Sequence, residues 1–234
     1  MKILAMDTSN QVLSVALLGD KQIISEVTTN IAKNHSVRLM PAVEKLMKDV
    51  NVTPSELDRI VVAKGPGSYT GVRIGLATAK TMAWALNIPV IGVSSLETLA
   101  YQGLLFDGII CPFFNARRGL VYTGAYQWKN ETLETVMDEE NILMTDWLAK
   151  LKESGEKILF LSQDIELFKN VIIEQLQDKA VIADISFQLP RAAHLALLGR
   201  GKEADSVHAL VPNYLRLTEA EANWQKQQKE KANR

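Results

Sequence analysis

Short apolar runs at the start of the chain predict a sheet. Residues 2–6, 12–18 and 22–28 each have the length and composition of a strand, and the tight turn at Gly19-Asp20 predicts that the last two pair antiparallel. Over residues 34–50 the apolar positions instead share one broad arc at helical period. The beginning of the chain is therefore expected to form three strands followed by a helix.

A strand, a glycine turn, a helix and a second strand are expected next. Residues 59–63 and 90–93 are apolar and strand-like, and a helix is expected over residues 69–86, ended by Asn87. The turn that joins the first of these strands to the helix is Gly65-Pro66-Gly67-Ser68. This order of elements is typical of a βαβ unit with parallel strands.

The helix expected over residues 69–86 is apolar on nearly every side. Its charged residues, Arg73 and Lys80, fall in one narrow sector, and Val72 and Leu76 lie on a stripe that we expect to pack on the sheet. Two interpretations remain open. Either the helix is buried within its own domain, or one face packs on the sheet and another face packs on a second protein.

The second half of the chain repeats this order of elements. Apolar periods predict three strands, a helix, a strand, a helix, a short strand and a last helix, over residues 108–114, 120–128, 132–138, 145–153, 157–161, 165–176, 180–183 and 190–199. We expect two domains, 1–103 and 104–218, each of βββαβα(β) type. The polar tail, 219–234, is expected to be a frayed helix or disordered.

Composition narrows the class of protein. Hydrophobic residues make up 47% and charged residues 23% of the 234 residues, as in globular proteins with a sizeable core. The 26 Lys and Arg nearly balance the 27 Asp and Glu, which argues against a dedicated nucleic-acid binder. The sequence has no apolar run of about 18 residues that would span a membrane, and it turns polar too soon after Met1 for a signal peptide. We expect a cytoplasmic protein.

Two stretches carry candidate chemistry. The N–H groups of the glycine turn lie at a helix N-terminus, where an anion can bind, but the turn lacks the Lys-Ser/Thr of a P-loop and the three spaced glycines of a dinucleotide fingerprint. A structural turn is the better-supported interpretation. Asp7 ends the first strand beside two hydroxyls, which can cap the turn that follows. Cys111 lies in an apolar run, where a reactive thiolate is disfavoured.

Motifs distributed along the chain give the strongest indication of function. They lie at residues 5–9 (AMDTS), 34–47, 65–80 (GPGSYTGVRIGLATAK), 88–100, 116–126 and 212–216 (PNYLR), and so extend over nearly the whole chain. In order and spacing they resemble the bacterial TsaB (YeaZ) family. The resemblance implies an α/β protein with the actin-like ATPase fold (ASKHA, ribonuclease H-like) in two repeated halves. It also implies a non-catalytic partner or scaffold of TsaD, which transfers the threonylcarbamoyl group to N6 of adenosine 37 in tRNAs that read ANN codons.

The resemblance also bears on nucleotide binding. In actin-like kinases an aspartate at the place of Asp7 holds magnesium near the phosphates, so a weak nucleotide site is implied at Asp7, Thr8, Ser9, Gly65, Gly67, Ser68 and Arg117. Asn115 stands where the TsaB family usually has aspartate, so a second carboxylate for hydrated Mg²⁺ is missing. We expect no catalytic residue and no tightly bound cofactor, with ATP or ADP and Mg entering through the complex. The alternatives are an ATP-dependent phosphotransferase or kinase and, less favoured, a glycoprotease-like peptidase.

Metal binding is not expected. The paralogous TsaD family binds a metal through an HxxxH motif that directly follows a strand of its first half. Here Ser95 and Leu99 stand at the two histidine positions, and leucine has no donor atom. His35, His194 and His208 lie far apart in the sequence and lack the spacing of metal ligands.

The expected partners follow from the resemblance and from the two apolar helices. We expect a heterodimer with TsaD, and a homodimer in its absence, through the helices at 34–50 and 69–86. The expected interface residues are Val37, Met40, Val43, Met47, Gly71, Ile74, Gly75, Thr78, Thr81, Met82 and Ala85. The small ATPase TsaE is a further expected partner. Contact with tRNA is expected to be indirect, through the complex.

Overall fold

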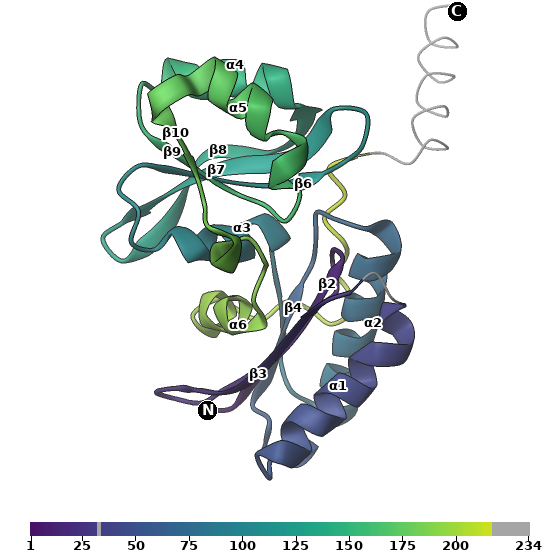
Figure 1. Ribbon diagram of the computed structural model, residues 1–234. Helices are drawn as coiled ribbons and strands as arrows, with labels where there is room; N and C mark the ends of the chain where they lie inside the picture. Colours follow the sequence, from purple (N-terminus) through teal and green to yellow (C-terminus); the bar gives the residue numbers. More distant parts are fainter. Residues whose placement is uncertain (32–33, 217–234) are drawn as a thin grey trace, which may run out of the picture.

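The computed structural model describes residues 1–31 and 34–216, which form two lobes, each built on a mixed five-stranded sheet (Figure 1). The strands of the first sheet are β1 (Ile3–Asp7), β2 (Val12–Leu18), β3 (Ile23–Asn30), β4 (Arg59–Ala63) and β5 (Val90–Val93), in the order β3-β2-β1-β4-β5. β1 pairs antiparallel with β2 and parallel with β4. The expected polar tail, 219–234, lies outside the described residues.

The second sheet repeats this arrangement. Its strands are β6 (Ile109–Asn115), β7 (Leu120–Lys129), β8 (Thr132–Leu143), β9 (Ile158–Leu161) and β10 (Ala180–Ile182), in the order β10-β9-β6-β7-β8. In both sheets the first strand is central, with its antiparallel hairpin partner on one side and a parallel strand on the other. The repeated order matches the topology predicted from the sequence.

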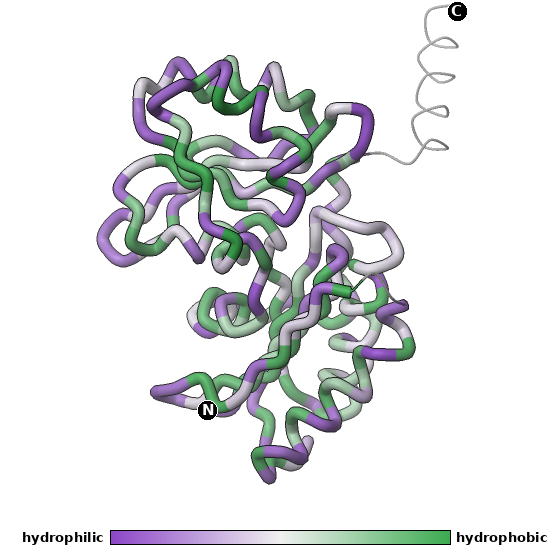
Figure 2. Tube along the Cα trace, in the orientation of Figure 1, coloured by the Kyte–Doolittle hydropathy of each residue, from purple (hydrophilic) through white to green (hydrophobic). Residues whose placement is uncertain are grey.

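Helices cover both sheets. They are α1 (His35–Asp49), α2 (Tyr69–Leu86), α3 (Ser95–Ala100), α4 (Met144–Glu153), α5 (Lys169–Leu176) and α6 (Ala192–Arg200). α1 and α2 pack on one face of the first sheet, while α4 and α5 pack on the outer face of the second. In Figure 2, α1 alternates between hydrophobic and hydrophilic residues, as expected for a helix with one buried face. Within the described ranges, no helix is long and apolar enough to cross a membrane.

The two helices between the sheets each pack on the sheet of the other half. α3 follows β5 of the first sheet, but its Leu99 belongs to one apolar cluster with Phe114 of the second sheet. α6 follows β10 of the second sheet, but its Ala196 clusters with Ile3 of the first sheet. The structure therefore puts α6, which the expected domain 104–218 includes, on the first sheet.

Two predicted elements differ from the structure in extent or continuity, and α3 was not predicted. β8 continues beyond the predicted range 132–138, through Glu139 and Glu140, to Leu143. It is an edge strand paired with β7 alone, so its acidic side chains can contact water while its backbone stays paired in the sheet. The predicted helix 165–176 is divided, because the backbone leaves helical geometry at Phe168 between a 3-10 turn and α5.

The burial of His194 predicts a pH dependence for the junction between the lobes. Its ring, on α6, stacks on Tyr101 with the centroids 4.7 Å apart. Burial, with a smaller contribution from the positive charge of Arg191, lowers the pKa of His194 from 6.5 to about 4. Because the folded chain resists protonation of this ring, stability is lost as the pH falls below the unfolded pKa.

We therefore expect the wild type to lose about 2 kcal/mol more than His194→Phe between pH 8 and pH 5, measured as the free energy of urea unfolding. Phenylalanine keeps the stacked ring and removes the titrating group. His208→Phe, at an exposed histidine, is the matched control and should follow the wild type. Parallel pH profiles for the wild type and His194→Phe would contradict the expectation.

Candidate functional site

A polar cleft of about 550 Å³ lies between the lobes, where β1 and β6 end. Five segments that are distant in sequence line it, and one of them is the turn after β9 at Gln163 and Asp164. Gln11 comes from the turn after β1, Ser68 from the start of α2, Arg117 from the β6–β7 turn, and Arg216 from the end of the described chain. The carboxyl ends of sheet strands are where α/β proteins usually bind ligands. The cleft is thus the first candidate for a functional site.

The turn after β1 lies beneath this cleft and is packed against the start of α2. Asp7 is 1% exposed, and its Oδ1 accepts a hydrogen bond of 2.8 Å from the backbone N–H of Ser9. Burial raises the pKa of Asp7, and its Oδ2 has no hydrogen-bond partner among the described residues. The hydroxyl of Thr8 donates to the carbonyl of Gly71 at 2.8 Å. Asp7 therefore acts within the turn and does not line the cleft.

The glycines next to this turn permit the close packing. A Cβ at Gly67 would lie 2.1 Å from the carbonyl oxygen of Ser9, and a Cβ at Gly71 would lie 2.2 Å from that of Thr8. The N–H of Ser68 donates to the carbonyl of Ser9 at 2.6 Å. An N–H group that would meet a phosphate in a P-loop is thus bonded to the chain's own backbone.

The predicted nucleotide-site residues divide into two sets. Gly67, Ser68 and Arg117 line the cleft. The buried set, beneath the cleft, consists of Asp7, Thr8, Ser9 and Gly65. The nucleotide site stays a prediction.

Asp164 is a cleft residue that sequence reasoning missed. It follows β9, and its Oδ2 accepts a hydrogen bond of 3.0 Å from the N–H of Asn115. A second carboxylate therefore lies at the β6–β7 turn, although not at the position of Asn115. The rule that parallel strands end at one edge of a sheet could have found it, because β6 and β9 are adjacent and parallel. Its contact with the backbone of Asn115 holds the turn in place.

The two positions matched to the paralogue's histidines lie in α3. Ser95 and Leu99 are both fully buried, and Leu99 packs in the apolar cluster of the second sheet. The hydroxyl of Ser95 has no hydrogen-bond partner in the described part of the chain. Across residues 1–31 and 34–216, no group of three or more His, Cys, Asp or Glu side chains could hold a metal ion. That the chain binds no metal stays a prediction.

An apolar groove of about 610 Å³ lies along α1 and α2, away from the cleft. It is lined by Met40, Val43, Met47 and Met82, which were all predicted interface residues. Val43 and Met47 are only 2% and 5% exposed, so they form its floor. The groove is a second candidate site, suited to a partner's apolar side chains.

The predicted interface residues differ in their exposure. Val37 and Met40 are 67% and 46% exposed. Among the remaining residues on α2, Thr81 and Ala85 are exposed, and Ile74, Thr78 and Met82 are half-buried. Gly71 and Gly75 are buried, so the prediction that they lie on a partner surface is wrong. A Cβ at either glycine would meet an oxygen of Thr8, which shows that these glycines admit the turn after β1.

Sequence reasoning also missed Trp84 on α2. Its side chain is 70% exposed, which is unusual for so large an apolar group. Thr81, Trp84 and Ala85 share one face of the helix because they are three and four residues apart. This exposed face adjoins the groove at Met82.

The topology of the two sheets is that of the actin-like ATPase fold. A ROK hexokinase from Thermus thermophilus shares the fold, with a TM-score of 0.51 at 10% identity over 86% of this chain and 98% of that chain. A crystal structure from Pseudomonas aeruginosa, described as an uncharacterized protein with similarity to peptidase YEAZ, has a TM-score of 0.79. It is 28% identical and covers 92% of this chain and 99% of that chain. The predicted fold class is confirmed.

Sequence comparison identifies the family. The family model described as "TsaD: tRNA N6-adenosine threonylcarbamoyltransferase" matches residues 22–224. The tRNA threonylcarbamoyladenosine biosynthesis protein TsaB from Bacillus subtilis is 55% identical over 229 residues, which are 98% of this chain and 100% of that protein. The chain belongs to the TsaB family, as the motifs predicted.

Proposed function

We propose that the chain is a non-catalytic partner of TsaD in the synthesis of threonylcarbamoyladenosine at position 37 of tRNAs that read ANN codons. Its membership in the TsaB family, whose Bacillus subtilis member is named for this biosynthesis, supports the role. The hydrogen bond from Ser68 N to Ser9 O is the observation that supports a non-catalytic role. With this N–H engaged and Asp7 buried, neither is available for the donor and carboxylate roles that phosphoryl transfer requires.

The proposed docking surface for TsaD is the face of α1 and α2 around the groove. TsaD is described by the same family model that matches residues 22–224, so a related pair of helices is expected on its surface. The groove lined by Met40 and Met82, with exposed Thr81 beside it, supports this choice. We further propose a homodimer through this face in the absence of TsaD, recruitment of TsaE to the complex, and a cytoplasmic location. Any ATP or ADP with Mg would enter through the complex.

Reconstitution tests the proposed function. Purified TsaD, threonylcarbamoyl-adenylate and tRNA are combined with and without this chain, and modified adenosine is measured. We expect modified adenosine to form when the chain is present, and little of it to form when the chain is omitted. Full activity of TsaD alone would contradict the proposal. Turnover of Mg-ATP by the isolated chain would instead favour the phosphotransferase alternative.

Asp7→Asn tests whether this carboxylate has a catalytic role. Asparagine keeps the size of the side chain and an oxygen that can accept from Ser9 N, so we expect tRNA modification within about twofold of the wild type. Loss of a magnesium ligand would cost about 10²-fold or more. Such a loss in a folded, complexed variant would revive the enzyme alternative.

Stability provides an independent measurement on the same variant. Because burial raises the pKa of Asp7, the folded wild type disfavours the ionised form and loses stability as the pH rises from the unfolded pKa towards the folded one. Asp7→Asn lacks this loss, so its free energy of unfolding should depend less on pH over that window. Identical pH profiles would contradict the assignment of a raised pKa.

A further inference from the structure

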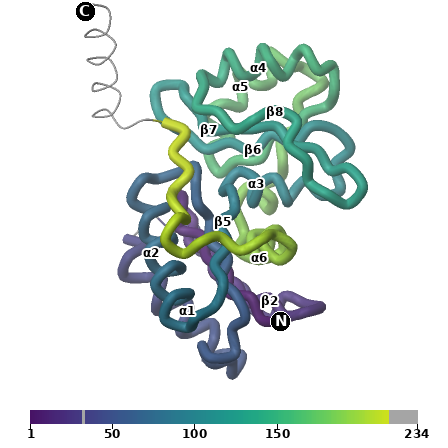
Figure 3. The backbone as a smooth tube through the Cα atoms, turned by 180° about the vertical axis from the view of Figure 1, so that it is seen from behind, coloured from purple at the N-terminus to yellow at the C-terminus, as the bar shows by residue number. Residues whose placement is uncertain are grey.

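The last described segment of the chain, residues 205–216, is here called the strap. It leaves α6, passes the edge of the first sheet at β5, and reaches the second lobe beside α2 (Figure 3). Asp205 N–H donates to the carbonyl of Val90 at 2.9 Å, and the Asp205 carboxylate accepts from Gly92 N–H at 2.7 Å. The N–H of Asn213 donates to the carbonyl of Lys64 at 2.7 Å. The strap is thus bound to the first lobe along its length.

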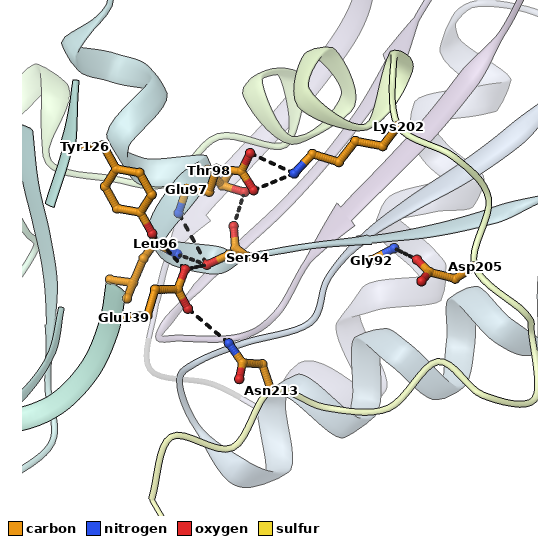
Figure 4. A network of polar contacts seen from close by, with 10 residues as sticks. All are labelled: Gly92, Ser94, Leu96, Glu97, Thr98, Tyr126, Glu139, Lys202, Asp205 and Asn213. Atoms are coloured by element: carbon orange, nitrogen blue, oxygen red, sulfur yellow. Dashed lines mark hydrogen bonds and ion pairs between the residues drawn. The ribbon is translucent and has the colours of Figure 1, made fainter. Parts of the chain in front are cut away.

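Glu139 connects the strap to the second lobe. Its carboxylate, on β8, receives three donors (Figure 4). Oε1 accepts from the hydroxyl of Ser94 and, at 2.7 Å, from the hydroxyl of Tyr126, while Oε2 accepts from the side-chain amide of Asn213 at 3.0 Å. One charged acceptor therefore holds a strand of the second lobe, the start of α3 and the strap together.

The donors around Glu139 are themselves held in place. The hydroxyl of Ser94, the N-cap of α3, accepts a hydrogen bond from Leu96 N–H at 3.1 Å. Its single hydrogen is donated to Glu139. Burial raises the pKa of Tyr126 well above its usual value, which keeps this hydroxyl protonated as a donor. Three residues beyond Asn213, the guanidinium of Arg216 donates to the carbonyl of Ala116 at 3.4 Å, and Arg216 lines the polar cleft.

We propose that Glu139 and the strap form a latch that fixes the width of the polar cleft and positions Arg216 in it. The latch joins the lobes at a carboxylate, and its closure requires an uncharged donor at position 213. While Asn213 is bound to Glu139, the strap, which is bound to the first lobe, is also held to the second, and the lobes keep one separation. The latch belongs to the chain by itself and does not depend on the partnership with TsaD.

Asn213→Asp tests the latch because it changes one amide into a carboxylate of the same size. The two carboxylates would then face each other, so the strap should detach from Glu139. We expect amide hydrogen exchange over residues 205–213 to accelerate by about tenfold or more, while exchange in β1 and β2 is unchanged. Asn170→Asp, on the exposed surface of α5, is the matched control and should leave the strap protected.

The double variant Glu139→Gln/Asn213→Asp should restore the protection. The new amide at position 139 can donate to the new carboxylate at position 213, which reverses the direction of the original hydrogen bond. Spin labels are placed on Thr70→Cys and Arg118→Cys, exposed positions next to the cleft-lining residues Tyr69 and Arg117. They should give one narrow distance for the wild type and the double variant and a broad distribution for Asn213→Asp. The native Cys111 is fully buried and does not compete for label.

Two results would overturn the latch. One is a strap that keeps its protection in Asn213→Asp, and the other is a double variant no better protected than Asn213→Asp alone. If Asn213→Asp does not fold, Glu139→Gln decides, because it removes the charge while keeping the shape of the acceptor. Strap exchange several-fold faster than in the wild type would then support the latch, and unchanged exchange would refute it.

Discussion

Thr81→Arg should separate this chain from TsaD and also from a second copy of itself. Thr81 lies at the centre of the exposed face of α2, between Ala77 and Ala85 and next to Trp84. An arginine there would be buried without a partner in the complex, at a cost of about 3–5 kcal/mol, or about a hundredfold or more in the dissociation constant. The position is exposed in the isolated chain, so the free energy of unfolding should change little. Sedimentation and pull-down with TsaD measure the effect.

The matched control is Thr145→Arg, which puts the same charge on the exposed face of α4 in the second lobe. This variant should retain both complexes. If Thr81→Arg keeps its affinity for TsaD, the docking surface lies elsewhere on the chain. If it unfolds the monomer, α2 is covered within the chain itself in solution, which would contradict the exposure of this face.

Gly71→Ala should strongly destabilise the first lobe. In an ordinary helix this change is favourable by about 1 kcal/mol, because alanine has the higher helix propensity. Here the new Cβ would lie 2.2 Å from the carbonyl oxygen of Thr8, and backbone on both sides would have to move. We expect a loss of about 3 kcal/mol or more in the free energy of unfolding, at the upper end of overpacking effects. Urea unfolding followed by circular dichroism measures it.

Gly201→Ala is the control, because a Cβ at Gly201 meets nothing within 4 Å. Its backbone is in the right-handed helical region, so alanine fits without strain. This variant should be as stable as the wild type or slightly more stable. A Gly71→Ala variant that is equally stable would mean that the turn after β1 does not pack as closely on α2 as the structure shows.

The elements and the packed face of α2 could be predicted from local sequence. Val72 and Leu76 were expected to pack on the sheet, and both are buried, because a stripe at helical period identifies the inward face whatever it contacts. The spacing of Gly71 and Gly75 was less informative. Small residues four apart permit close approach to a helix or to a turn alike, and here the neighbour is the turn at Thr8.

The contacts between the lobes were beyond the reach of sequence reasoning. Glu139 lies in an acidic stretch of an edge strand, where most carboxylates face water, and nothing local separates it from Glu140. Its partner Asn213 is distant in the chain, and an apolar face such as that of α3 or α6 does not specify which of two sheets it will cover. Asp7 could be interpreted as a ligand or as a turn residue until its burial distinguished the two.

The position of α6 also determines when the first lobe can be completed during synthesis. The sheet face that carries Ile3 and Val61 is covered by Ala192, Leu195 and Ala196. About 100 residues separate the end of β5 from α6, so a ribosome adding roughly 5–20 residues per second needs roughly 5–20 s to supply that cover. Throughout this interval the sheet face of the first lobe lacks the cover of α6, so an apolar surface stays open to contacts with other molecules until α6 has emerged.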